Sequence, residues 1–310
     1  MPAGLSTRPA NRPRTFRPGD AHGVVLALLS AVGLGLAIAV ARYAYEGGTN
    51  GLTVAAVRSL ALALALFVWC RATGRTLGLR GADRRRCAGL GLLMAMGFYG
   101  NVGAVEFISI GLTALLFFTF PPLIALIQAV TDRAWPALAK VVALATAFAG
   151  LATMLGASLG ASDPRGVALV LGAAVAVALN SVGIVRLVGH IHPLVAMFHM
   201  AVAAAVALPA LALATGSVQL PQSATGWAGM SGVIALQCAS LPMYFVAVAR
   251  VGALKTAMLA NIQPVVSIAA ARALFGELLG TAQLIGGAMV LAGVMLMQWH
   301  DGRSRRRSTP

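Results

Sequence analysis

Ten apolar segments, each about 20 residues long, limit most strongly how this chain can fold. About 20 consecutive apolar residues form a helix that just crosses the hydrocarbon layer of a membrane. Of the 310 residues, 59% are hydrophobic and only 10% are charged, whereas soluble domains carry about 25% charged residues. The chain cannot cover a water-exposed surface, so we expect an all-α membrane protein. The segments lie at residues 22–42, 52–71, 87–106, 110–130, 136–157, 165–188, 194–215, 225–248, 252–274 and 280–299.

The basic residues indicate how these segments are oriented. Cytoplasmic connections of membrane proteins carry an excess of lysine and arginine. If the N-terminus is cytoplasmic, most of the 23 basic residues lie on that side, in both tails and in the connection at 71–86. Arginine is far more frequent than lysine, as in proteins from GC-rich bacterial genomes. We expect a multi-pass protein of a bacterial inner membrane with both termini in the cytoplasm, and the net charge of +15 needs no nucleic-acid partner.

One stretch of the chain occurs twice. Thr113–Pro121 and Thr256–Pro264 share Thr, Ala, Leu and Pro at the same spacing, and matching residues stand 143 positions apart. The same offset relates Asp20 and Gly23 to Asp163 and Gly166. Each half would hold five segments, an odd number, so the second half has to enter the membrane from the opposite side. We therefore predict ten transmembrane helices in two inverted five-helix repeats, at residues 20–157 and 163–300, between a disordered basic tail at 1–19 and a second basic tail at 301–310.

Each copy of this stretch has a proline near the middle of a predicted membrane helix. A proline removes one hydrogen bond of the helix and frees a carbonyl one turn earlier. In a membrane such a group is tolerated where it faces protein or a cavity. Interrupted helices at corresponding places in two halves point to the binding site of a transporter. We expect Pro121 and Pro264 to act as conformational hinges beside that site.

These features together resemble the drug/metabolite transporter superfamily, EamA type. The likeness rests on ten spans in two halves, each with a Thr-Ala-x-Leu run before a mid-helix proline, and on Val251–Glu277, which is similar to that family's ninth helix. Arg58 stands where such proteins often carry an arginine in the second helix. The first half departs from the pattern, because its fourth helix ends in Thr131-Asp132-Arg133 instead of Gly-Glu. The resemblance implies export of metabolites, with bacterial amino-acid exporters as the nearest type, by a monomer.

Polar residues within the predicted helices are the candidates for substrate binding. Intramembrane polar side chains usually face protein or a water-filled cavity, and several here share one helix face. The functional interpretation is a central pathway lined by the third, fourth, eighth and ninth segments. The alternative is that they hold packed helices together, as Ser, Thr, Asn and Gln commonly do in membranes. The candidate substrate-binding residues are Tyr99, Asn101, Asn180, Gln237, Tyr244, Asn261 and Gln263.

Two further candidates carry or can acquire a positive charge. Arg58, two turns inside the second segment, is either a cation for a substrate carboxylate or a structural residue that pairs with Glu46 or Glu106. His199, in the seventh segment, could couple transport to protons, because histidine is the side chain that most readily changes its charge near neutral pH. A neutral, hydrogen-bonded histidine is the alternative for that position.

Motifs that the sequence lacks argue against several classes of transporter and against an enzyme. Segment 22–42 has no central carboxylate, which an exporter of organic cations would need, and no cluster of central cations is present for a nucleotide sugar. No nucleophile motif, metal-ligand spacing or cofactor motif occurs, so we expect neither an enzyme nor a bound cofactor or metal. We predict alternating-access export of small metabolites, chiefly amino acids, aromatic or other neutral ones among them. A drug or other small-metabolite exporter is the alternative. The expected partners are a small-molecule substrate and membrane lipid.

Overall fold

The chain forms helices joined by short connections. The computed structural model describes residues 21–104, 107–108, 110–133, 135–155, 163–276 and 280–308, and no strand occurs among them. The prediction of an all-α membrane protein is confirmed, because seven helical spans of the described residues are long and apolar enough to cross a membrane. The helices are α1 (Ala21–Glu46), α2 (Gly51–Ala72), α3 (Gly81–Gly103), α4 (Ile110–Phe117), α5 (Phe120–Asp132), α6 (Leu138–Leu155), α7 (Pro164–Arg186), α8 (Pro193–Ala214), α9 (Ala224–Val251), α10 (Ala253–Ala260), α11 (Ile262–Phe275) and α12 (Thr281–Ser308).

The predicted segments coincide with these helices, with three differences. The fourth and ninth segments are each divided in two, as α4–α5 and α10–α11. Helix α3 starts six residues earlier than predicted, because the basic turn Arg84–Arg86 is helical as well. Helix α12 continues to Ser308, so most of the predicted C-terminal tail is helical. Within residues 301–308 the weakest helix former is Gly302, and one glycine costs a helix about 1 kcal/mol.

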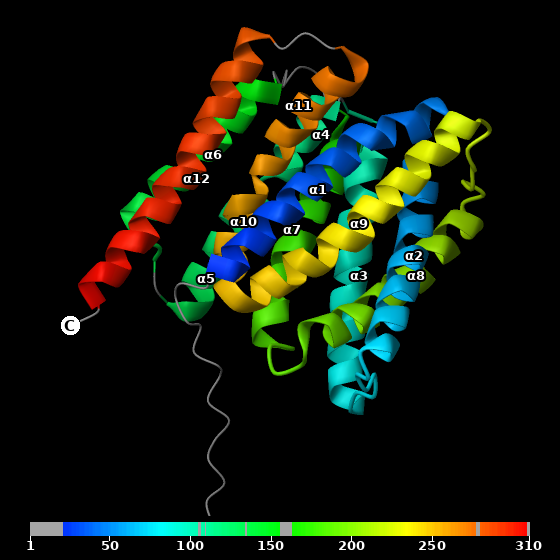
Figure 1. Ribbon diagram of the computed structural model, residues 1–310, viewed down its shortest axis with the longest axis horizontal. Helices are drawn as coiled ribbons and strands as arrows, with labels where there is room; N and C mark the ends of the chain where they lie inside the picture. Colours follow the sequence, from blue (N-terminus) through cyan, green and yellow to red (C-terminus); the bar gives the residue numbers. More distant parts are fainter. Residues whose placement is uncertain are drawn as a thin grey trace, which may run out of the picture.

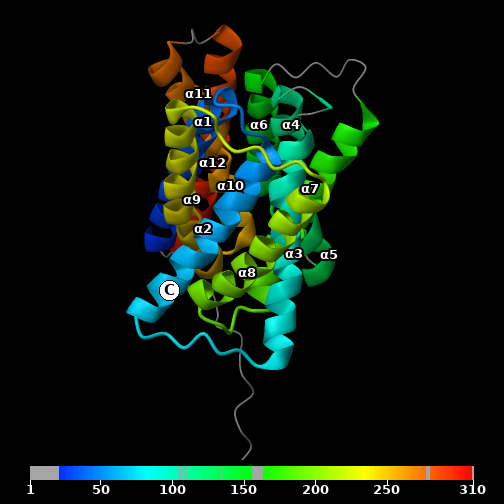
Figure 2. The same cartoon turned by 90° about the vertical axis from the view of Figure 1, so that its right-hand side faces the viewer.

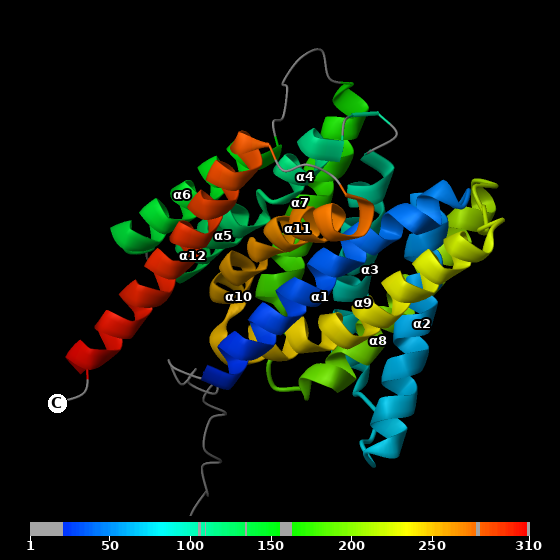
Figure 3. The same cartoon turned by 45° about the horizontal axis from the view of Figure 1, so that its top comes forward.

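The helices pack as a main bundle with one helix pair at its edge. Helix α1 crosses α9 over most of its length, α2 packs on α8, and α3 lies between α7 and α8. Helices α6 and α12 pair closely with each other and stand beside the bundle (Figures 1 and 3). The start of α1, the end of α12 and the α2–α3 connection lie toward the same end of the molecule (Figures 1 and 2).

Glycines allow α6 and α12 to approach closely. A Cβ atom at Gly150 of α6 would lie 2.6 Å from the carbonyl oxygen of Gly286 in α12, and one at Gly293 of α12 would lie 2.6 Å from that of Ala143 in α6. Backbones therefore touch at this crossing, and any side chain would force the pair apart. Small residues at helix contacts are typical of membrane bundles, where dispersion contacts replace the hydrophobic effect.

The two interrupted helices are arranged alike. After α4 the chain makes a turn at Phe118 and Thr119, and α5 then begins with Pro121 in its first turn. Between α10 and α11 the only residue outside both helices is Asn261, and Pro264 lies in the first turn of α11. The missing N–H of proline is harmless in a first turn, where the N–H has no helical acceptor. Both prolines thus start a new helix inside the membrane.

The fourth span ends without the glycine that the resemblance implies. Arg133 caps α5 in the left-handed conformation, with φ 50° and ψ 36°, and its N–H donates to the carbonyl of Ala129. Gly276 caps α11 in the same way, with φ 69°, and its N–H donates to the carbonyl of Arg272. The capping geometry is therefore kept in α5 although a side chain makes the left-handed conformation less favourable there.

Candidate functional site

The interruption between α10 and α11 places an amide group inside the bundle. Asn261 is only 4% exposed, and its Oδ1 atom is buried without a hydrogen-bond partner. The next turn carries Gln263, which is half-buried, and its backbone carbonyl lies against Gly35 of α1. A buried amide oxygen with no partner costs about 1–3 kcal/mol, so this group is available to a ligand that can donate a hydrogen bond.

The polar residues of α9 have different surroundings. The hydroxyl groups of Tyr244 and Ser181, on α7, lie 3.3 Å apart and link the two helices. Ser240 faces Gly33 of α1 instead, at the close crossing of α1 and α9, and Gln237 is 3% exposed. Tyr244 therefore belongs to the contact of α9 with α7, and Ser240 to its contact with α1.

Asn180 and His199 each hold two parts of the chain together. The Nδ2 group of Asn180 donates to the carbonyl of Leu90 over 2.6 Å and joins α7 to α3. The Nε2 atom of His199 lies 2.8 Å from the carbonyl oxygen of Leu77, in the α2–α3 connection. These contacts agree with the alternative that the sequence left open for both residues, a hydrogen bond between neighbouring elements.

Arg58 lies on α2, beside α3. Its guanidinium carbon is 4.3 Å from the centroid of the Phe98 ring, within the range of a cation–π interaction. Its Nε atom is buried without a hydrogen-bond partner, and no ion pair to Arg58 exists among the described residues. Of the predicted partners, Glu46 pairs with Arg42 instead, at 2.7 Å, and Glu106 lies outside the described residues.

The remaining candidates on α3 lie one and three residues after Phe98. Tyr99 and Asn101 are both half-buried. Tyr99 packs against the main hydrophobic core, and so does the half-buried Tyr244 of α9.

Two further buried hydroxyl groups lack a hydrogen-bond partner, and neither residue was among those predicted to bind substrate. Thr113 Oγ1 in α4 and Ser30 Oγ in α1 are buried without hydrogen-bond partners. Thr113 occupies the position in the first half that Thr256 occupies in the second, where the hydroxyl donates to the carbonyl of Gly252 at 2.8 Å. The duplication was a signal for Thr113, whereas a serine within an apolar helix gave none for Ser30.

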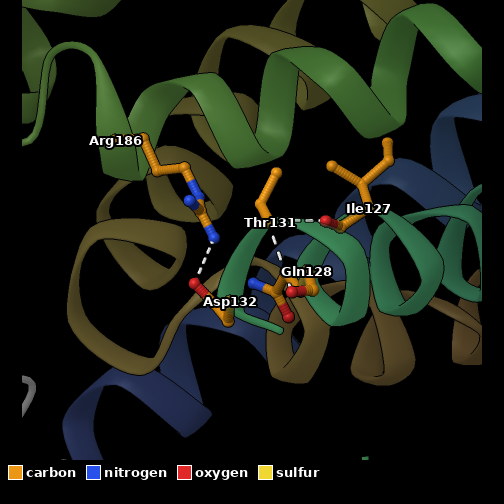
Figure 4. Close-up of polar contacts among 5 residues, drawn as sticks. All are labelled: Ile127, Gln128, Thr131, Asp132 and Arg186. Atoms are coloured by element: carbon orange, nitrogen blue, oxygen red, sulfur yellow. Dashed lines mark hydrogen bonds and ion pairs between the residues drawn. The ribbon is translucent and has the colours of Figure 1, made fainter. Parts of the chain in front are cut away.

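Ionic contacts gather at the end of the molecule that carries the α2–α3 connection. Asp132, the last residue of α5, accepts a hydrogen bond from Arg186, the last residue of α7, at 2.5 Å (Figure 4). Asp83, in the first turn of α3, lies 3.2 Å from His190 and 3.1 Å from Arg86. The hydrogen bond from His190 lowers the pKa of the Asp83 carboxyl below its usual value, and Arg86 acts in the same direction. These contacts join the ends of α3, α5 and α7 and the α7–α8 connection.

A separate groove lies between the α6–α12 pair and the main bundle. It has a volume of about 180 Å³, and its walls are almost entirely apolar. Trp135 and Leu138 at this place are strongly exposed, as expected for side chains that face lipid. No candidate substrate residue lines the groove, whose walls include Pro122, Leu126, Trp135, Lys140, Leu254 and Met297.

Comparison with known proteins identifies the type of protein. Residues 164–299 match the family described as "EamA-like transporter family". The second half of the chain is an EamA-like transporter domain. The resemblance to drug/metabolite transporters is thereby confirmed for the second half, and the apolar helices of both halves make the chain a multi-pass membrane protein. The matched family is one of transporters.

A solved structure extends the likeness in fold to both halves. The structure, described as "Crystal structure of protein", superimposes with a TM-score of 0.72 over 90% of this chain and 98% of its own, at 18% sequence identity. At that identity the likeness concerns the fold alone. No match was found among curated proteins.

Proposed function

We propose that this EamA-like transporter exports small metabolites, chiefly amino acids, aromatic or other neutral ones among them, across a bacterial inner membrane. Two inverted five-helix halves, residues 20–157 and 163–300, alternate the access to a central site. Pro121 and Pro264 are the hinges about which α5 and α11 move.

The glycine contacts support the two inverted halves. Gly23 of α1 lies against Arg250 and Val251, and Gly166 of α7 lies against Phe107 and Ile108. Gly166 stands 143 positions after Gly23, and Arg250 and Val251 stand 143 positions after Phe107 and Ile108. The same contact thus occurs twice, once with the glycine in the first half and once with the glycine in the second. The α6–α12 crossing has the same reciprocity, since Gly150 and Gly293 are separated by that offset and each touches the other helix. Two unrelated crossings with one offset favour a pseudo-twofold axis between the halves.

The observation that carries the substrate proposal is the unpartnered Oδ1 atom of Asn261 at the interruption of the ninth span. A carbonyl-type acceptor suits an ammonium or hydroxyl group. Interrupted helices in transporters commonly supply such backbone and side-chain acceptors near the middle of the membrane. The half-buried Gln263, two residues further along the chain, adds a second amide, and Tyr99 and Tyr244 supply aromatic walls.

Counterflow of the twenty amino acids in liposomes that contain the purified transporter tests the function. We expect Asn261→Ala and Gln263→Ala to weaken uptake several-fold each, because one lost hydrogen bond costs about 1 kcal/mol. Thr153→Val is the matched control. Its hydroxyl bonds only to the carbonyl of Ala149 in its own helix, so uptake should stay unchanged.

Three outcomes separate the possibilities. Normal uptake by both amide variants would place the site elsewhere, and Arg58, Asn180 and His199 would be the next residues to test. Transport of apolar drugs or of metabolites other than amino acids, with no amino-acid counterflow, would favour the alternative exporter class. Weaker uptake by the Thr153→Val control would mean that the losses reflect folding.

A further inference from the structure

Arg58 is a buried cation for which the described part of the protein provides no anion. The residue is half-buried on α2, two turns from the start of that helix, and its Nε atom is buried without a hydrogen-bond partner. Its guanidinium carbon lies 4.3 Å from the centroid of the Phe98 ring. No carboxylate of the described residues forms an ion pair with it.

Such an arrangement is unfavourable unless something else compensates it. Arginine within a membrane helix is costly, and it normally pairs with an acid or faces a water-filled path. A cation–π contact offsets only part of that cost and satisfies none of the N–H groups. Of the two acidic residues proposed from the sequence, Glu46 pairs with Arg42, and Glu106 lies outside the described residues. The surroundings of Arg58 therefore favour an anionic ligand.

We propose that Arg58 binds the carboxylate of the transported molecule, so that the substrates of this protein are small carboxylic acids, amino acids included. The proposal rests on the function proposed above and narrows it to a substrate class. The Nε–Nη edge of a guanidinium matches the two oxygens of a carboxylate and forms two parallel hydrogen bonds. The ring of Phe98 packs on one flat face of the group and takes none of its hydrogen bonds, and the Nε atom has no partner.

The geometry also excludes a class of substrate. A neutral amide or ester has no charge to offset the buried cation, and a simple amine would be repelled by it. An apolar drug without an acidic group gains nothing from Arg58. The transporter should therefore prefer substrates with a negative charge at one end, whatever the shape of the substrate's other end.

The test uses three probes that share a phenyl group: phenylalanine, phenylalaninamide and 3-phenylpropionate. Purified full-length transporter is tested for a ligand-dependent rise in its unfolding temperature in detergent, and for uptake of the same probes in liposomes. We expect phenylalanine and 3-phenylpropionate to bind at least tenfold more tightly than phenylalaninamide. Arg58→Gln should abolish this preference, and Arg58→Lys should keep part of it, because the charge remains while the fork geometry is lost.

Phe98→Leu is the matched control for a merely structural role of Arg58. It removes the cation–π contact and leaves the cation, so it should lower stability while the preference for acids persists. Should Arg58→Gln fail to fold, Arg58→Lys together with Phe98→Leu still decides the question. A reduced preference in the lysine variant alone supports the site, and an equal reduction in both assigns Arg58 to packing.

The results separate this inference from the function on which it rests. Amino-acid transport with equal preference in the wild type and in Arg58→Gln would overturn the carboxylate site and leave the exporter function intact. Arg58-dependent binding of 3-phenylpropionate with no amino-acid uptake would keep the site and refute the amino-acid substrates. Binding of none of the acids by the wild type would overturn the carboxylate site outright.

Discussion

Arg133 occupies a backbone conformation that suits glycine better. Gly276, at the corresponding place in the second half, uses the same left-handed cap without penalty, whereas a residue with a Cβ atom loses roughly 1–2 kcal/mol there. We expect Arg133→Gly to raise the free energy of unfolding by about 1 kcal/mol. Thermal unfolding of the purified protein in detergent measures this.

Arg133→Ala is the control, because it removes the charge and keeps the unfavourable conformation. Stabilisation by glycine but not by alanine would identify the backbone as the cause. An equal effect of both variants would instead point to the charge of Arg133 and contradict the prediction.

At the residue scale, the polar candidates illustrate what a sequence can supply. Asparagine and histidine inside apolar helices are visible in any sequence, and both Asn180 and His199 were selected for that reason. Their partners, the carbonyl groups of Leu90 and Leu77, are far away in the chain and have no side-chain signature. Asn261 differs because its oxygen has no partner, which only the packed structure reveals.

At the scale of helices, the ends of the two interrupted spans carry different chemistry. Asp132 of α5 pairs with Arg186 of α7. The positions that correspond to them by the offset of 143 are Phe275 and Tyr43, whose rings lie 4.8 Å apart. Arg42 also lies over Phe275, at 4.5 Å. If the halves alternate access, an ionic contact closes one end of the molecule and an aromatic contact closes the other.

This difference predicts how the ionic contact responds to mutation. Both side chains are partly exposed, at 37% and 56%, so the pair is worth at most about 1 kcal/mol. Asp132→Asn or Arg186→Gln should change the uptake rate by up to about fivefold. The effect should fade at high salt, because ions screen exposed charges.

The exchange of both charges is the control for this pair. Asp132→Arg combined with Arg186→Asp should restore the rate of the wild type, measured by uptake into liposomes. If the exchanged pair behaves like the sum of the two single variants, the contact does not control the conformation.

At the scale of the whole molecule, the orientation in the membrane is the main prediction. The start of α1, the end of α12 and the basic α2–α3 connection lie toward the same end of the molecule, and the excess of arginine there favours the cytoplasm. In a variant without Cys70, Cys87 and Cys238, single cysteines at Ser6 and Ser308 should react with an impermeant thiol reagent only after the membrane is opened. Labelling of either position in intact cells would contradict this orientation.

The oligomeric state belongs to the same scale, and we expect a monomer. Gly286 and Gly293 could in principle support a helix–helix dimer through α12. Both are already used within the chain, against Gly150 and Ala143 of α6, so this surface is not available to a second copy. Lipid is the expected neighbour of the exposed outer faces of α6 and α12.

The sequence alone determined that this protein lies in a membrane, that it is all-α, and where most of its helices lie. Long apolar segments form helices in a membrane, because the backbone N–H and C=O groups must find their hydrogen-bond partners within each segment. Even the two interruptions were predictable, since proline cannot continue the hydrogen bonds of a helix. The left-handed cap at Arg133 was not, because nothing in an arginine signals that conformation.

Tertiary structure alone decided which polar residues are free. Whether an intramembrane amide or guanidinium has a partner depends on groups brought together from different helices, often backbone carbonyls that are the same in every residue. In the folded protein Asn180 and His199 each join two elements by a hydrogen bond. Ser240 lies at the contact with α1. Asn261 and Arg58 each have a buried polar atom without a hydrogen-bond partner. Burial without a partner is costly. Thr113 and Ser30 share this state, and Asn261 and Arg58 are the two residues for which we propose a ligand.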